Sequence, residues 1–119
     1  MTFEQAIRSG FDHYTKFDGR ANRPAFWYWV LFAFAAGVAA NIVDVIIGTQ
    51  ILSYLLGLAL LLPGISVAIR RLHDTNRTGW WYLLVFTIVG IIVLIIFWAE
   101  EGDAGDNKYG PPMAAPVAA

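Results

Sequence analysis

The sequence predicts an all-α integral membrane protein: an N-terminal amphipathic interfacial helix followed by three transmembrane helices. Three apolar segments, at about residues 26–47, 51–69 and 80–99, are each near the ~20 residues that a helix needs to span ~30 Å of hydrocarbon. Hydrophobic residues make up 58% of the chain and charged residues only 14%, whereas soluble domains carry ~25% charged residues. Tryptophan and tyrosine cluster where the first and third segments begin, as they do at membrane interfaces.

Residues 2–16 are expected to form the amphipathic helix. Thr2 and Gln5 have the spacing of a capping box, in which each side chain satisfies a free backbone N–H of the first turn. Charged side chains of alternating sign recur every four residues on one face. The opposite face is apolar, with Phe3, Ile7, Phe11 and Tyr14. Such a helix suits the membrane interface, although packing against the rest of the protein is an alternative, and both can hold.

We expect a single membrane domain over residues 1–112 and a disordered tail at residues 113–119. The net charge of −1 argues against a nucleic-acid partner, and the absence of cysteine excludes disulfides and thiolate sites. No cleavable signal is visible in the first 25 residues, so the first apolar segment is expected to direct insertion.

The basic residues are distributed unevenly about the three predicted spans. Residues 1–25 and the loop 70–79 hold all of them except Lys108. With three spans, these two regions lie on one side, and the positive-inside rule places them in the cytoplasm and the C-terminus outside. The alternative is that one apolar segment is re-entrant, which would bring the tail inside. The third segment itself is too apolar to favour that alternative.

Small and polar residues inside the spans suggest packing contacts. Pro63 and Gly64 predict a kink in the second span. Small residues permit close helix packing, either within one three-helix bundle or between copies of the chain. Asn41 and Asp44 lie near the outer end of the first span. They give a second functional hypothesis, an oligomeric channel or transporter whose path passes these two residues.

The main candidate site is a cluster of arginines and tryptophans at the cytoplasmic headgroup layer. The planar guanidinium matches phosphate, so this cluster predicts binding of an anionic lipid headgroup or of a membrane partner. The alternative is that the arginines only follow the positive-inside rule and pair with Asp18 and Asp74. The ligand-binding candidates are Arg20, Arg23, Arg70, Arg71, Arg77, His73 and Asp74, and the interface anchors are Trp27, Trp80 and Trp81.

The pair His73-Asp74 also allows an enzymatic interpretation, because a carboxylate can orient an imidazole for acid–base work. One such pair is weak evidence, and a metal site would require His13, His73 and acidic residues to converge without any recognised spacing. We therefore expect no enzyme activity, no cofactor and no metal. The expected partners are membrane lipids, anionic ones in particular, with a membrane protein or a second copy of the chain as alternatives.

Three motifs resemble a known family. They are Gly19-Arg20-Ala21-Asn22-Arg23 with Phe26-Trp27, then Arg70-Arg71-Leu72-His73-Asp74 with Arg77-Thr78-Gly79-Trp80-Trp81, and finally Asn107-Lys108-Tyr109-Gly110-Pro111-Pro112. In this order they resemble domain of unknown function 805, a family of bacterial inner-membrane proteins. The resemblance covers residues 17–112 and implies a small multi-spanning protein of the cytoplasmic membrane, with no established activity. Asn76 stands where that family commonly has glycine, and Thr78 where serine is common.

The closing motif conflicts with the predicted topology, which places residues 107–112 outside and away from both arginine motifs. Three solutions remain open from the sequence. The protein has two separate sites, the tail folds back as a structural cap, or the topology is wrong.

Overall fold

The computed structural model describes residues 2–113, and the regular elements in that range are helices. The expected tail at 113–119 therefore lies outside the described residues, except for Met113. The elements are α1 (Phe3–Asp12), α2 (Arg23–Ile47), α3 (Ile51–Asp74), the 3-10 helix η1 (Gly79–Phe86) and α4 (Ile88–Ala99).

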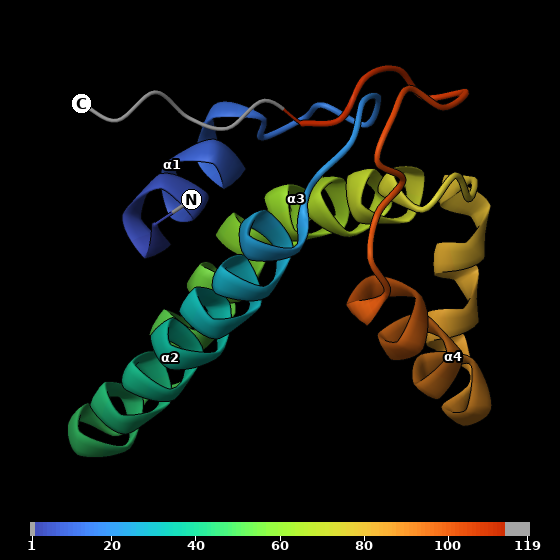
Figure 1. Ribbon diagram of the computed structural model, residues 1–119. Coiled ribbons are helices and arrows are strands. Elements are labelled where there is room, and N and C mark those ends of the chain that lie inside the picture. Colours follow the sequence, from blue (N-terminus) through green and yellow to red (C-terminus); the bar gives the residue numbers. More distant parts are fainter. Residues whose placement is uncertain (1, 114–119) are drawn as a thin grey trace.

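The helices α2 and α3 form an antiparallel hairpin, the longest feature of Figure 1. Their 25 and 24 residues each rise over about 36 Å, and both are long and apolar enough to cross a membrane. The Asn22 side chain caps α2 by accepting a hydrogen bond from the Ala25 N–H, and Gly48 ends that helix with a left-handed φ of 76°. These two helices agree with the first two predicted segments, extended by the turns that carry the arginine motifs.

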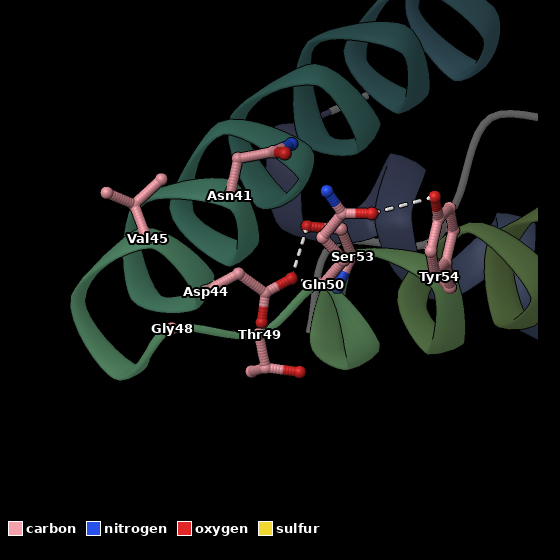
Figure 2. A pocket seen from close by; sticks show the side chains of 8 residues that line it. All are labelled: Asn41, Asp44, Val45, Gly48, Thr49, Gln50, Ser53 and Tyr54. Atoms are coloured by element: carbon pink, nitrogen blue, oxygen red, sulfur yellow. Dashed lines mark hydrogen bonds between the residues drawn. The ribbon is translucent and has the colours of Figure 1, made fainter.

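The turn between α2 and α3 is closed by Asp44, which is buried. Its carboxylate accepts hydrogen bonds from the Leu52 N–H at 3.2 Å and from the Ser53 N–H and hydroxyl, each at 2.7 Å. Figure 2 shows Asp44 pointing across the turn to Ser53. A carboxylate in this place satisfies free N–H groups in the first turn of α3. Asp44 therefore stabilises the turn.

The third apolar segment is not one helix, which corrects the expectation of a single transmembrane helix at residues 80–99. The 3-10 helix η1 ends at Phe86, the backbone is extended at Thr87 with φ −124° and ψ 146°, and α4 begins at Ile88. The Thr87 hydroxyl accepts a hydrogen bond from the Gly90 N–H and so caps α4. In Figure 1, η1 and α4 run side by side in opposite directions.

The tail after α4 lies beside both arginine motifs, which corrects the expectation that it lies on the opposite face. The Asp103 N–H donates to the Asp74 carbonyl at 2.8 Å, and the Asn107 side chain donates to the His73 carbonyl at 3.0 Å. The physical reason is the reversal of the chain at Thr87: η1 leads away from the end of α3, and α4 leads back to it. Of the three solutions left open for the closing motif, two separate sites are excluded, because the motif contacts the end of α3.

The helix α1 is docked on the α2–α3 hairpin. Its capping box between Thr2 and Gln5 is present as expected, and it ends at Asp12 rather than at residue 16. Gly10 is buried under the ring of Trp29, and the Phe11 ring meets the same indole edge-on at 5.1 Å. The alternative of packing against the protein is thus observed.

Pro63 lies inside α3, where it removes one backbone hydrogen bond. Figure 1 shows α3 changing direction along its length, so that its C-terminal turns lead away from α2 toward η1. This change of direction agrees with the kink expected at Pro63-Gly64. It carries the end of α3 to the place where the tail and the α1–α2 linker meet.

Replacing Gly10 by alanine tests the docking of α1. A Cβ atom at position 10 would overlap the Trp29 ring, whereas one at Gly37 has no atom within 4 Å. We expect Gly10→Ala to lower the free energy of unfolding by ~1–3 kcal/mol through overpacking. We expect Gly37→Ala to leave it unchanged or raise it, because alanine favours helix. Thermal unfolding in detergent, followed by circular dichroism, measures both. Equal melting temperatures for the two variants would contradict the packing described.

Candidate functional site

The carboxylate of Asp74 sits between two buried arginines at the end of α3. It accepts a hydrogen bond from Arg20 Nε at 2.9 Å through one oxygen and pairs with Arg71 Nη1 through the other. Both arginine side chains are fully buried, and the Asp74 side chain is only 8% exposed. Two buried cations share one buried anion, so the remaining N–H groups need acceptors from elsewhere.

Arg20 finds its other acceptors in the tail. Its Nη1 donates to the carbonyls of Gly105 and Gly110 at 2.7 and 3.2 Å, and its Nη2 donates to the carbonyls of Asp74 and Asp103. With the bond from Nε to Asp74, all five N–H donors of this guanidinium have partners. Arg20 is therefore a strut between the α1–α2 linker and the tail, with no donor left for a ligand.

Arg71 caps the C-terminal end of α4. Its Nε donates to the Trp98 carbonyl at 2.9 Å, its Nη2 donates to the Glu100 carbonyl, and its Nη1 also reaches the Ala21 carbonyl at 3.2 Å. The last carbonyls of a helix lack intrahelical donors, and a cation there also opposes the helix dipole favourably. Arg71 thus joins α3 to α4 and to the linker.

The closing motif forms a tight turn on the end of α3. Asn107 and Gly110 exchange backbone hydrogen bonds, and the Tyr109 ring stacks on the His73 ring with centroids 3.9 Å apart. The Lys108 N–H donates to the Asn76 side chain at 3.3 Å. Asn76 itself has a φ of 61°, a conformation that glycine adopts freely and asparagine tolerates. This accounts for asparagine at a position where the family commonly has glycine.

Gly102 allows the tail to approach this cluster. A Cβ atom at position 102 would overlap the Asp74 carboxylate. The tail backbone therefore passes directly over the shared carboxylate, and only glycine fits there without displacing it.

The other predicted site residues take separate positions. Arg77 pairs with Glu100 at 3.0 Å and lies 3.8 Å above the centre of the Phe97 ring. Arg23 is exposed at the start of α2, and its side chain makes no hydrogen bond to residues 2–113. Of the predicted anchors, Trp27 is half-buried and donates to the Trp98 carbonyl at 3.3 Å, whereas Trp80 and Trp81 are 78% and 43% exposed.

The enzymatic interpretation of His73 and Asp74 finds no geometric support. His73 Nδ1 bonds the Gly19 carbonyl at 2.9 Å and its ring stacks on Tyr109, whereas the Asp74 carboxylate is held by two arginines. Although His73 and Asp74 are adjacent in sequence, their side chains bind different partners and do not contact each other through a hydrogen bond. Within residues 2–113, acidic and histidine side chains do not gather in threes that would hold a metal ion.

Arg70 differs from Arg20 because its guanidinium has an N–H donor without an acceptor among residues 2–113. The residue is 2% exposed, and its Nε donates to the Ser66 hydroxyl at 3.3 Å. Its Nη2 atom is buried and donates to no residue in the described part of the chain. Buried donors without acceptors are rare in native proteins, since each costs about 1–3 kcal/mol and more when charged.

Arg70 lines a cavity of about 420 Å³ between the α1–α2 linker and the tail. Lys16, Asp18 and Arg20 contribute to the linker side, and Tyr109 contributes to the tail side. Arg20 is already paired with Asp74, so Lys16 and Arg70 are the two cations that line the cavity together with the carboxylate of Asp18. Asp18 attracts Arg70 electrostatically, but it forms no ion pair within 4 Å among residues 2–113. The cavity is therefore electropositive and contains a buried, incompletely bonded guanidinium.

Sequence reasoning missed three residues of this region. Ser66 donates to the His13 carbonyl at 3.0 Å and contacts the Lys16 carbonyl, which fixes the linker over Arg70. Gly102 and Trp29 set the close approach of the tail and of α1. A serine one turn before Arg70 was visible as a candidate partner, but the contacts of Gly102 and Trp29 depend on the tertiary fold.

The residues of the channel hypothesis lie at the far end of the α2–α3 hairpin. They line an open pocket of about 610 Å³ around Asn41, Asp44 and Ser53 (Figure 2). The Asn41 side chain donates to the Gly37 carbonyl of its own helix at 2.8 Å, and Asp44 is occupied in the turn. The two side chains thus stabilise their own helices and the turn.

The family described as "Protein of unknown function (DUF805)" matches residues 14–111 of the chain. Inner membrane protein YhaI of Escherichia coli (strain K12) is 43% identical, over 82% of this chain and 86% of the relative. Inner membrane protein YhaH of the same strain is 34% identical, over 83% and 88%. Uncharacterized protein YiiR is 28% identical, over 92% and 89%. No solved structure matches the chain.

Replacing Asp74 by asparagine tests the shared carboxylate. The change removes one negative charge from between two buried arginines, so we expect the free energy of unfolding to fall by ~3–5 kcal/mol. We also expect faster tryptic cleavage after Lys108, because the tail would be released. Asp106→Asn, at an exposed position of the same tail, is the matched control. Thermal unfolding and timed proteolysis in detergent are the measurements. An Asp74→Asn protein that matches this control in both would refute the role given to Asp74.

Proposed function

Because the chain belongs to the DUF805 family, whose function is unknown, we propose its function from its own geometry: it is an inner-membrane protein that binds a phosphate group, with an anionic phospholipid headgroup as the favoured source. The observation that carries the proposal is the buried Nη2 atom of Arg70, which has no acceptor among residues 2–113 and belongs to a residue that lines an electropositive cavity.

The membrane location is supported by two independent observations. The helices α2 and α3 are long and apolar enough to cross a bilayer, and α2 is mostly exposed along its apolar length. Two relatives that cover more than four fifths of the chain are named inner membrane proteins. An exposed apolar surface of this extent is suited to lipid rather than to water.

The cavity lies at the end of the bundle that the positive-inside rule assigns to the cytoplasm. With the tail folded back, the short turn at the other end of the α2–α3 hairpin, residues 48–50, carries no lysine or arginine. Both arginine motifs and Lys108 lie at the opposite end. This distribution favours a cytoplasmic arginine end more strongly than a topology with Lys108 outside.

Phosphate fits the cavity on charge and on geometry. A planar guanidinium binds phosphate oxygens through paired N–H donors, and Lys16 supplies a second, mobile cation at the rim. The aspartate at position 18 favours Arg70 in its charged form but repels an anion. Binding would give Arg70 Nη2 an acceptor, which residues 2–113 do not supply, and this gain opposes the repulsion by Asp18.

A lipid source is favoured over free phosphate by position. The cavity opens where the apolar length of the spanning helices ends, near the docked helix α1 with its exposed rings Phe3 and Phe11 and near the exposed Tyr14 that follows that helix. Aromatic side chains of this kind are typical of the headgroup layer. Arg20 and Arg71, predicted as ligands, are better described as supports, because all five donors of Arg20 and four hydrogen bonds of Arg71 are made within the protein.

Native mass spectrometry of protein released from a mild detergent tests this function. We expect retained phosphatidylglycerol or cardiolipin on the wild-type protein. We expect at least a tenfold loss of retention in Arg70→Gln and a smaller loss in Lys16→Gln, which alters only an exposed side chain of the same cavity. Arg8→Gln, on the exposed face of α1, is the matched control and should retain lipid. Asp18→Asn should increase retention, because it removes the carboxylate that repels an anion.

The outcomes separate the sources of the phosphate. Loss of lipid from Arg70→Gln and Lys16→Gln, with no binding of inorganic phosphate to the delipidated wild type, supports a headgroup site. Saturable binding of inorganic phosphate that the same variants abolish supports a soluble anion instead. Retention of lipid by Arg70→Gln at the wild-type level, in a protein that unfolds at the same temperature, overturns the proposal.

A further inference from the structure

The η1–α4 hairpin presents an apolar tip that meets no other part of the described chain. The side chains around the reversal are among the most exposed in the protein: Phe86 is 82% exposed, Ile88 83% and Val89 72%. The hairpin packs on itself instead, with the Trp81 and Phe97 rings edge to face at 5.4 Å. In Figure 1 it stands apart from the far end of the α2–α3 hairpin.

Both ends of this hairpin are fixed at the arginine end of the bundle. At the exit of α4, Arg71 bonds the carbonyls of Trp98 and Glu100, and Arg77 pairs with the Glu100 side chain. At the entry of η1, Gly79 packs against Ile69 so closely that a Cβ atom would meet the Ile69 side chain at 2.8 Å. Entry and exit therefore share one face of the membrane.

The length of the hairpin fits half of a bilayer. The 8 residues of η1 rise about 16 Å at ~2.0 Å per residue, and the 12 residues of α4 rise about 18 Å at ~1.5 Å per residue. One leaflet contributes ~15 Å of hydrocarbon. The tip thus reaches about the bilayer midplane, whereas α2 and α3 are long enough to cross.

The reversal is built so that the polar atoms of Thr87 are all bonded. Its N–H and hydroxyl both donate to the Leu84 carbonyl at 3.0 Å, its hydroxyl accepts from the Gly90 N–H at 2.9 Å, and its carbonyl accepts from the Ile91 N–H at 3.0 Å. A Cβ atom at Gly90 would overlap the Leu84 carbonyl and the Thr87 hydroxyl. Hydrocarbon requires such internal satisfaction of backbone groups, whereas a loop in water does not.

We propose that η1 and α4 form a re-entrant hairpin, which enters and leaves the membrane on the arginine face and contacts the acyl chains of that one leaflet. The protein then has two transmembrane helices, and its N-terminal helix, its 74–79 turn and its tail share one compartment. This inference rests on the hairpin alone and is independent of phosphate binding at Arg70.

Single cysteines test the hairpin directly, since the chain has no cysteine of its own. The probe is a membrane-impermeant maleimide applied to right-side-out and to inverted membrane vesicles. The four variants place one thiol each in α1, the 48–50 turn, the hairpin tip and the tail, at exposed positions: Glu4→Cys, Gln50→Cys, Ile88→Cys and Asp106→Cys.

We expect Glu4→Cys and Asp106→Cys to label from the same side, Gln50→Cys from the other, and Ile88→Cys from neither until detergent is added. A bimane at position 88 should be quenched most by lipids that carry a nitroxide near the acyl-chain ends. Labelling of Asp106→Cys from the same side as Gln50→Cys overturns the proposal, because the third segment would then cross the membrane. Rapid labelling of Ile88→Cys in intact vesicles from either side also overturns it.

Discussion

The structure depends on one carboxylate, that of Asp74, placed between the buried guanidinium groups of Arg20 and Arg71. Burying two cations beside one anion is unfavourable unless every remaining donor is bonded. The backbone carbonyls of the tail and of the end of α4 supply those acceptors. The pairing therefore explains why three segments far apart in sequence converge: the α1–α2 linker, the end of α3, and residues 98–110.

The convergence of these segments divides the arginines by role. Arg20 and Arg71 hold the tail through hydrogen bonds to its backbone carbonyls, and Arg77 forms an ion pair with Glu100. Arg70, one residue from Arg71 on the same helix, lines the cavity, and its buried Nη2 donor has no acceptor in the described part of the chain. A positively charged cavity is thus a by-product of the contacts that fix the tail, and its chemistry suits phosphate.

Sequence reasoning predicted the helices whose signals are local. The Thr2–Gln5 capping box, the two long apolar helices and the turn after residue 47 follow from spacing or length, and the structure agrees with them. Pairing of the arginines with Asp74 was the alternative to ligand binding, and the structure shows that pairing. The third segment was expected to be one helix because its composition is as apolar as a transmembrane helix, whereas the structure breaks it at Thr87. The signal that breaks it, Thr87 three residues before Gly90, is a short capping pattern that hydropathy averages away. Because three spans were counted, the tail was expected on the face opposite the arginine motifs.

The different contacts of Arg70 and Arg71 depend on which side of α3 faces the tail, and a single sequence does not specify that.

The central claim, that Arg70 binds phosphate while Arg20 and Arg71 are internal supports, is tested most directly by solid-state NMR in anionic lipid bilayers. The measurement is the dipolar coupling between lipid ³¹P and arginine side-chain ¹⁵N, compared between the wild-type protein and the Arg70→Gln, Arg71→Gln and Arg23→Gln variants. The account predicts a guanidinium within about 4 Å of phosphorus in the wild type, a contact expected of an arginine–phosphate pair. That signal should disappear in Arg70→Gln and persist in Arg23→Gln. A signal that survives in Arg70→Gln and disappears in Arg23→Gln would contradict the account, because phosphate would then bind the exposed arginine and not the cavity.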